Sequence, residues 1–336
     1  MRPGDTQPGG PACQAPFVAL EFDPAGIVYA CCASQLYPVG RVGESTLDQI
    51  WNGSRARVLR DAMDDWDFTV ACSSCRWHLE HGRPDPDAAV YDRYTVDTGD
   101  VPLPRAMTFA LSNRCNLACE MCSPALSSTL RARAGLAPLR SPYDDEFFDQ
   151  LAPMLHGLEY AKFLGGEPLL VPEHARVWDL LAKQPDRPQV QITTNGTIWN
   201  DRVEWLFETF ELDVTISIDG VTKATYESIR RGASHERVMR NVERYRDASS
   251  RQDTELRFCF CLMPQNADEL APFLLWADEL GAAVSINLVT DLGFSLHDQP
   301  RHELVALRDR WRGCDASLWS VAPAIRQTWE TQLVQL

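Results

Sequence analysis

Short apolar runs alternate with amphipathic runs along most of the chain from residue 107 onward. The runs with strand-like composition cover residues 107–112, 159–165, 189–194, 213–218, 256–263 and 283–289. Helical patterns cover residues 173–183, 203–210, 235–247 and 267–280. A strand followed by a helix and then another strand indicates parallel strands joined by right-handed crossovers. The pattern therefore predicts an α/β protein, either a doubly wound sheet or a barrel.

Polar and apolar residues also alternate within the predicted strands, most clearly near residue 216. Ile216 and Ile218 fall on one face, and Ser217 and Asp219 fall on the other. The apolar face should lie under the helices. The polar face should then line the lumen of a barrel. Residues expected on that inner face are Gln191, Thr193, Asn195, Thr215, Arg257, Cys259, Cys261, Ser285, Asn287 and Asp291.

The N-terminal region lacks this alternation of strands and helices. A hairpin is predicted around residues 24–26, and one helix over residues 45–63, capped by Ser45 or Thr46. Residues 76–105 contain four prolines and no sustained period, which is typical of a connector.

The pattern divides the chain into four segments. We expect an N-terminal domain at 1–80, a linker at 81–104, an α/β domain at 105–295 and a helical segment at 296–336. Three tryptophans of the last segment are expected to pack a closing helix pair, namely Trp311, Trp319 and Trp329.

Composition narrows the function classes. The chain has 336 residues, 47 of them acidic and 32 basic, for a net charge of −15, which disfavours nucleic acid as a partner. No apolar stretch approaches the roughly 18 residues of a membrane span, and the first ten residues lack a secretory pattern. We therefore expect a cytoplasmic protein without a membrane partner, in which the eleven cysteines are not disulfide-bonded.

Three cysteines follow the first strand of the α/β region. Cys115, Cys119 and Cys122 can hold an iron-sulfur cluster while leaving one iron without a protein ligand. A zinc loop is the alternative, but structural zinc prefers four ligands and no histidine lies nearby.

This C-x3-C-x2-C spacing resembles the radical SAM superfamily, and the resemblance extends over residues 107–288. Further matching motifs lie at residues 165–168, 194–196 and 217–220. The resemblance implies a partial (βα)6 TIM-type barrel with a small N-terminal iron-sulfur domain and C-terminal helices. It also implies a [4Fe-4S] cluster and S-adenosyl-L-methionine (SAM) as cofactors.

The same resemblance assigns roles to individual residues. Glu167 is expected to accept from the SAM ammonium group, and Arg230 to pair with its carboxylate, with Arg231 as the alternative. The full set of expected SAM-binding residues is Gly165, Gly166, Glu167, Asn195, Ser217, Asp219 and Arg230.

A second cysteine set precedes the α/β region: Cys13, Cys31, Cys72 and Cys75. Its spacing resembles the twitch domain, a shorter relative of SPASM, in which four cysteines ligate an auxiliary [4Fe-4S] cluster. Such domains usually follow the barrel, whereas this one comes first. Cys32 is the alternative to Cys31, and a zinc site using His78 or His81 is the alternative to a cluster.

The resemblance implies that a 5'-deoxyadenosyl radical abstracts hydrogen from the substrate. The auxiliary cluster would then take an electron and give an oxidised product, or a thiol such as Cys261 would donate hydrogen and give an epimer. We expect oxidation of a small cationic natural-product precursor, such as an amino sugar or aminocyclitol, with a flavodoxin or ferredoxin as reductant. The alternatives are a maturase or epimerase of ribosomally made peptides, an epimerase of an aminoglycoside-type sugar, and a non-catalytic electron carrier.

Overall fold

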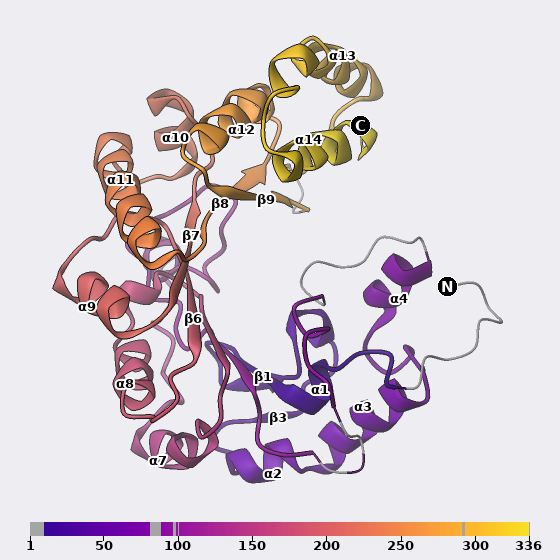
Figure 1. Ribbon diagram of the computed structural model, residues 1–336, viewed down its shortest axis with the longest axis vertical. Coiled ribbons are helices and arrows are strands. Elements are labelled where there is room, and N and C mark those ends of the chain that lie inside the picture. Colours follow the sequence, from indigo (N-terminus) through magenta and orange to yellow (C-terminus); the bar gives the residue numbers. More distant parts are fainter. Residues whose placement is uncertain (1–9, 81–88, 97–98, 100, 291–292, 336) are drawn as a thin grey trace. The chain divides into compact units, whose positions relative to one another are not determined.

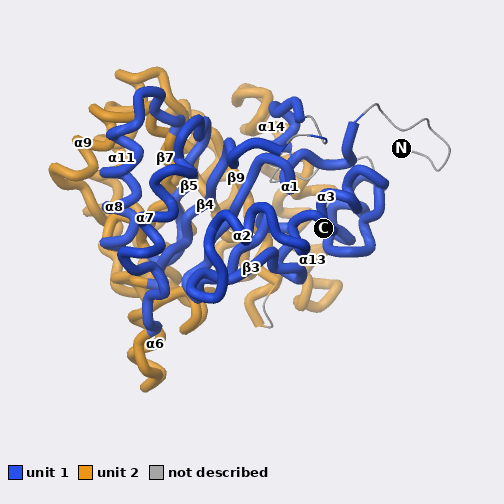
Figure 2. The backbone as a smooth tube through the Cα atoms, turned by 90° about the horizontal axis from the view of Figure 1, so that it is seen from below, with its two compact units in different colours: residues 1–113, 139–166, 171–189 blue, residues 114–138, 167–170, 190–336 orange. Residues whose placement is uncertain are grey.

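The computed structural model describes residues 10–80, 89–96, 99, 101–290 and 293–335. The chain forms two compact units, which Figure 2 shows in different colours. Unit 1 comprises residues 1–113, 139–166 and 171–189, and unit 2 comprises residues 114–138, 167–170 and 190–336. The units are not cut at residues 80, 104 and 295, and the predicted four-segment division stays a prediction.

Unit 1 contains a mixed sheet. Its strand order is β3-β2-β1-β4-β5. These strands are β1 (Ala19–Phe22), β2 (Ile27–Tyr29), β3 (Gly40–Arg41), β4 (Ala106–Phe109) and β5 (Tyr160–Phe163). The predicted hairpin is confirmed, because β1 and β2 are antiparallel. The sequence pattern did not predict the parallel pairing of β1 with β4, in which Ala19 lies opposite Ala106.

The helices of unit 1 include α1 (Ala15–Val18), α2 (Leu47–Trp51), α3 (Ser54–Asp64), α4 (Ser73–Glu80), α7 (Asp145–Met154), α8 (Pro172–Leu181) and the 3-10 turn η1 (Cys32–Ser34). The prediction of one helix over residues 45–63 is wrong, because Gly53 separates α2 from α3. The predicted cap is present: the Gln49 N–H donates to Thr46 Oγ1 at 3.2 Å. A Cβ at Gly53 would lie 2.3 Å from the Gln49 carbonyl oxygen, so this break requires glycine.

Unit 2 contains a parallel sheet. Its strand order is β6-β7-β8-β9. These strands are β6 (Gln189–Thr194), β7 (Leu212–Ser217), β8 (Leu256–Leu262) and β9 (Ala283–Leu288). Each of the six predicted strand regions thus overlaps a strand, β4 to β9 in chain order.

Helices flank the strands of unit 2, with α11 packed on β7 and β8, and with α12 and α14 packed on β9 (Figure 1). These helices include α6 (Ser128–Arg133), α9 (Asp201–Thr209), α10 (Lys223–Ile229), α11 (His235–Gln252), α12 (Leu270–Glu279), α13 (Arg301–Arg312) and α14 (Pro323–Gln335). Short 3-10 turns are η2 (Pro168–Leu170), η3 (Ala267–Glu269), η4 (Leu296–Asp298) and η5 (Asp315–Leu318).

The alternation predicted for these strands is present in β8. Phe258 stacks on Trp276 of α12 with ring centroids 4.7 Å apart, on the helix side of the sheet. On the other face, the Asn287 side-chain amide donates to Cys259 Sγ at 3.2 Å. The apolar set therefore forms the core under the helices, and polar groups cover the inner face. Asp291, also predicted there, lies outside the described residues.

The C-terminal helices confirm part of the tryptophan prediction. Trp311 and Trp329 are buried with ring centroids 5.4 Å apart. The prediction is wrong for Trp319, which is 64% exposed and lies under the Arg326 guanidinium. Within the described residues, no helix is both long enough and apolar enough to cross a membrane.

Candidate active site and iron-sulfur ligands

Three of the predicted metal ligands lie in a loop of unit 2, here called the cysteine loop (residues 115–122). Cys115, Cys119 and Cys122 are each half-buried. The loop is held at its middle like a strand, because the Ala118 N–H donates to the Arg231 carbonyl and the Glu120 N–H to the Ile229 carbonyl, both at 2.9 Å. The loop backbone is therefore fixed by hydrogen bonds to the segment 229–231.

Burial raises the pKa of Cys115 to about 11. It also raises the pKa of Cys119 and Cys122, although the Arg230 guanidinium opposes this shift at both thiols. Such thiols ionise readily only beside a metal charge, so the donor set fits an iron-sulfur cluster. Among the described residues, no three histidine, cysteine or acidic side chains gather closely enough to hold one metal ion.

Glu167 is fully buried in unit 2 and accepts three hydrogen bonds. Thr194 Oγ1 and the Asn195 N–H each donate to it at 2.8 Å, and the Leu169 N–H at 3.3 Å. Burial outweighs these bonds and raises the pKa of Glu167 to about 7. The carboxyl group is thus fixed in direction and poised to gain or lose charge near neutral pH.

Asn195 connects the end of β6 to the cysteine loop. Its Nδ2 donates to Asn116 Oδ1 at 2.9 Å and lies 4.0 Å from Cys115 Sγ. Thr197 completes the network, accepting from Asn116 Nδ2 at 2.9 Å and donating to Asn195 Oδ1 at 2.7 Å. Asn195 was predicted from the sequence and Asn116 was not, because nothing in the local pattern shows that the residue after the first cysteine has a partner some 80 positions away.

Asp219 and Arg230 form a buried ion pair at 2.7 Å. The Cys261 N–H donates to the other carboxylate oxygen of Asp219 at 2.8 Å. Burial acts to lower the pKa of Arg230, but the Asp219 carboxylate outweighs it and raises that pKa. The sequence suggested separate roles for the two residues, whereas the structure pairs them.

The structure also distinguishes the two adjacent arginines. The Arg230 side chain is 6% exposed, whereas Arg231 is 55% exposed and pairs with Glu120 at 3.0 Å. Arg230 is therefore the inward-facing residue of the two, and its contact with the SAM carboxylate stays a prediction.

The remaining predicted SAM-binding residues lie at strand ends. Ser217 ends β7 opposite Cys259 of β8. Gly165 and Gly166 follow β5 in unit 1 with φ of 85° and 54°, values that favour glycine. A Cβ at Gly165 would lie 3.0 Å from Ala110 Cβ, so close backbone packing alone restricts this position.

Cys261 lies half-buried on β8 against an apolar cluster in unit 2. The cluster contains Ile229, Met263 and Val289, with Met121 of the cysteine loop packed against it. A side-chain hydrogen bond with Cys259 and burial both raise the pKa of Cys261. This thiol therefore stays protonated, which is the state that a hydrogen-atom donor requires.

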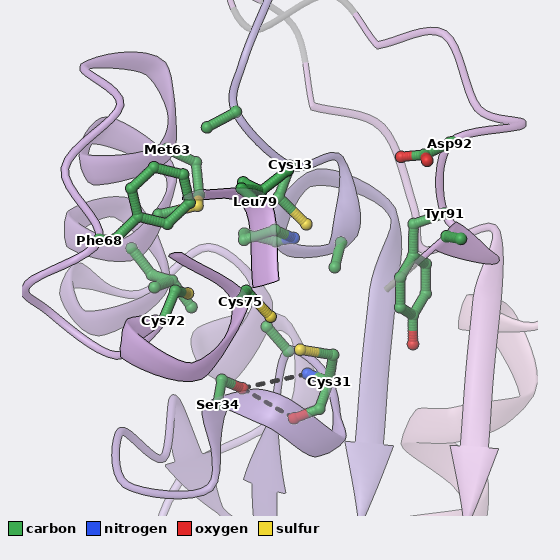
Figure 3. Close-up of a pocket in the computed structure, with 16 residues that line it drawn as sticks. Cys13, Cys31, Ser34, Met63, Phe68, Cys72, Cys75, Leu79, Tyr91 and Asp92 are labelled. Carbon is green, nitrogen blue, oxygen red and sulfur yellow. Dashed lines mark hydrogen bonds between the residues drawn. The ribbon is translucent and has the colours of Figure 1, made fainter. Parts of the chain in front are cut away.

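The second cysteine set lines one pocket of unit 1, here called the cysteine pocket. Its four cysteines, Cys13, Cys31, Cys72 and Cys75, surround a cavity of about 80 Å³. Figure 3 shows the sulfur atoms of Cys13, Cys31 and Cys75 directed toward the middle of the pocket. The remaining lining residues are mostly apolar and include Leu59, Met63, Phe68, Leu79 and Tyr91.

The sequence left Cys31 and Cys32 as alternative members of this set, and the surroundings of the two residues differ. Cys31 is buried in the pocket, whereas Cys32 is exposed and does not line it. Ser34 fixes Cys31, because its Oγ accepts from the Cys31 N–H at 3.1 Å and donates to the Cys31 carbonyl at 2.9 Å (Figure 3). This geometry favours Cys31 as the ligand.

The donor set of the cysteine pocket fits a cluster. Burial, together with smaller contributions from the neighbouring thiols, raises the pKa of Cys13 and Cys72 to about 12 and that of Cys31 to about 11. Four thiolates around one pocket, two buried and two half-buried, would repel one another unless iron compensated their charge. His78, a possible zinc ligand, does not line the pocket, and His81 lies outside the described residues.

Comparison with known families agrees with this geometry. The family model described as "Radical SAM superfamily" matches residues 109–277, about half of the chain. The chain belongs to the radical SAM superfamily. A second model, SPASM, described as "Iron-sulfur cluster-binding domain", matches residues 13–76 and so contains all four cysteines of the cysteine pocket.

The predicted family, fold class and cofactors are therefore confirmed. This radical SAM protein has a partial barrel of the TIM type, uses a [4Fe-4S] cluster with SAM, and carries an N-terminal domain for auxiliary iron-sulfur binding. The ligand and SAM-contact residues named above stay predictions.

Curated relatives include the GTP 3',8-cyclase of Streptomyces coelicolor, 33% identical over 177 residues, which are 51% of this chain and 48% of that protein. GTP 3',8-cyclase 1 of Mycobacterium tuberculosis is 26% identical over 220 residues, covering 64% and 57% of the two chains. The chain thus spans about half the length of these relatives.

Among solved structures, native anSMEcpe with bound AdoMet is 19% identical, with coverage of 65% and 63% and a TM-score of 0.49. A radical SAM methyltransferase from Sphaerobacter thermophilus is 15% identical, with coverage of 60% and 61% and a TM-score of 0.40. At such distances the likeness says nothing about the substrate.

Proposed function

We propose that this radical SAM enzyme removes two hydrogens from a small, cationic, hydroxyl-rich natural-product precursor, such as an amino sugar or aminocyclitol. The observation that carries the proposal is the cysteine pocket, where four cysteines are available to saturate one cluster. A saturated cluster has no iron open to substrate and suits electron transfer. The substrate would lose one hydrogen atom, then one electron to this cluster and one proton to solvent, which balances a two-electron oxidation.

The residues of unit 2 prepare the first step. When bound, the cluster and SAM would supply a 5'-deoxyadenosyl radical for hydrogen abstraction. Cys115, Cys119 and Cys122 would hold the cluster, and Glu167 and Arg230 would orient SAM through its ammonium and carboxylate groups. Their fixed side chains limit the motion of a bound charged ligand, which favours one reactive geometry.

The substrate class follows from charge and from the inner face of the sheet. The net charge of −15 favours cations over polyphosphates. On the inner face, Gln191 Nε2 donates to Thr215 Oγ1 at 3.5 Å, and Asn287 contacts Cys259. Neutral amides and hydroxyls of this kind suit a substrate rich in hydroxyl and amino groups. Free thiols are consistent with a cytoplasmic enzyme, which we also propose.

A rearrangement of GTP is the second candidate, because the relatives at 33% and 26% identity are GTP 3',8-cyclases. The acidic charge argues against a triphosphate substrate. Epimerisation is a further alternative, favoured by the protonated Cys261 thiol. Peptide maturation is tested by the same assay.

The test is anaerobic turnover of the reconstituted enzyme in D2O with dithionite, SAM, and separate additions of amino sugars, aminocyclitols, GTP and peptides. We expect 5'-deoxyadenosine and a product two hydrogens lighter from an amino sugar or aminocyclitol, without deuterium on carbon. Turnover of GTP or a peptide alone would contradict the proposed substrate class. Deuterium on carbon that disappears in Cys261→Ala, with Cys314→Ala as control, would replace oxidation by epimerisation.

A further inference from the structure

The segment that follows the cysteine loop is unlike the rest of this acidic chain. No aspartate or glutamate occurs between Glu120 and Asp144, the longest such stretch in the sequence. Within it, residues 125–138 of unit 2, here called the Arg-Leu face, carry Arg131 and Arg133. A local positive surface on a molecule with a net charge of −15 attracts an acidic partner.

The Arg-Leu face is ordered yet contributes almost nothing to the core. Its helix α6 has no buried residue. Leu126 is 54% exposed and Leu136 is 48% exposed. The Arg131 guanidinium donates to the Ala137 carbonyl, which holds the return of the chain against the helix. A six-residue helix is marginal by itself, and arginine is enriched at protein interfaces.

Three hydroxyl side chains connect this face directly to the first predicted cluster ligand. Ser128 Oγ accepts from the Cys115 N–H at 3.0 Å, and Thr129 Oγ1 donates to the Cys115 carbonyl at 2.7 Å. Ser127 Oγ donates to the Leu117 carbonyl at 2.7 Å and also accepts from the Leu130 N–H, which caps α6. A partner bound to α6 would therefore stand next to the cysteine loop.

We propose that the Arg-Leu face is the docking surface for an acidic, low-potential electron carrier of the ferredoxin or flavodoxin class. The proposal rests on the assignment of Cys115, Cys119 and Cys122 to the SAM-binding cluster. In the step it serves, one electron leaves the carrier and reduces this cluster, and no covalent bond forms or breaks. Arginine charge would steer the acidic carrier, and the small apolar contact suits a transient redox complex that must dissociate after each transfer.

The experiment compares a docking reductant with one that needs no docking. The variant Arg133→Glu reverses an exposed charge of α6, and Arg244→Glu makes the same change at an exposed position of α11. Each reconstituted protein is mixed with SAM and either an acidic two-cluster ferredoxin, reduced beforehand, or dithionite. The initial rates of cluster reduction and of 5'-deoxyadenosine formation are recorded at low and at high salt.

With ferredoxin at low salt, we expect Arg133→Glu to slow cluster reduction by about tenfold, because charge steering raises association rates by at least that factor. High salt should reduce the difference in ferredoxin-driven rate between wild type and Arg133→Glu. Arg244→Glu should match the wild type under all conditions. With dithionite, wild type and Arg133→Glu should have equal rates.

Equal ferredoxin rates in wild type and Arg133→Glu would overturn the proposal. So would an equal loss with dithionite, since the change would then act on the cluster itself. In a parallel assay with substrate and dithionite, a raised KM for substrate in Arg133→Glu would overturn it in favour of an acidic substrate docking here. If a Cys115→Ala, Cys119→Ala, Cys122→Ala triple variant still formed 5'-deoxyadenosine with dithionite, the cysteine-loop assignment would fall, independently of the docking surface.

Discussion

The cysteine loop and the cysteine pocket offer iron two different environments. The loop is half-buried and is surrounded by charged or polar groups, including Glu167, Arg230 and Asn195. The pocket is lined mainly by apolar residues such as Leu59, Met63 and Phe68. Three thiols in a polar setting suit a cluster that binds a charged ligand at an open iron. Four thiols in an apolar setting suit a cluster that only exchanges electrons.

The largest expected effect comes from removing the three cysteines of the loop. A Cys115→Ala, Cys119→Ala, Cys122→Ala triple variant should lose SAM cleavage completely and retain about four of about eight irons, because only the pocket cluster remains. Iron analysis and 5'-deoxyadenosine formation measure the two quantities. Residual SAM cleavage in this variant would contradict the division of roles.

The pocket can be tested with two adjacent residues. Cys31→Ala should lower the iron content from about eight to about four per chain, since the buried ligand is removed. Cys32→Ala is the matched control and should keep all irons, because Cys32 is exposed outside the pocket. The reverse result would make Cys32 the ligand in place of Cys31. A wild-type protein that contained one zinc and four irons would show that the pocket is a structural zinc site.

The ion pairs of unit 2 give a smaller effect on stability. Asp219→Ala leaves Arg230 buried without its carboxylate partner and should lower the free energy of unfolding of the apoprotein by about 3–5 kcal/mol. Glu120→Ala breaks the more exposed pair with Arg231 and should cost less than about 1 kcal/mol. Urea unfolding measures both, and equal losses would show that burial does not separate the two pairs.

The smallest effect concerns pH. Because burial raises the pKa of Glu167 to about 7, its carboxyl is neutral below that pH and charged above it. SAM affinity should therefore weaken as pH falls below 7, by up to about tenfold per unit, since the ammonium group loses an ionised partner. Titrations from pH 6 to 8 should show this dependence in wild type and Glu208→Gln but not in Glu167→Gln. An unchanged slope in Glu167→Gln would assign the dependence to another group.

Much of the fold was predictable because it is encoded locally. The alternation around Ile216 and Phe258 placed apolar residues under the helices and polar ones inside, and the strands formed where predicted. The pairing of β1 with β4 was not predictable in this way, since strands more than 80 residues apart leave no local period. The break at Gly53 was not predicted, because a single glycine inside a helical pattern is tolerated and does not by itself end a helix.

In the candidate site, too, local motifs were predictable and contacts between distant residues were not. Cysteine spacing selected Cys115 as a candidate ligand, and the family resemblance selected Glu167 and Arg230 as candidate SAM contacts, roles that stay predictions. Partnerships between loops were missed, as with Asn116 and Asn195, because side-chain pairing over long separations depends on the folded backbone. Burial also distinguishes residues that the spacing left as alternatives. Cys31 is buried and Cys32 is exposed, and Arg230 is buried whereas Arg231 is exposed.

The central claim is that only the cysteine loop leaves an iron open to SAM. Electron paramagnetic resonance of the dithionite-reduced protein tests it with two variants, one lacking the three loop cysteines and one lacking the four pocket cysteines. Adding SAM should change the spectrum of the variant that keeps the loop and leave unchanged that of the variant that keeps the pocket. A SAM-dependent change in the pocket cluster, or none in the loop cluster, would contradict the account.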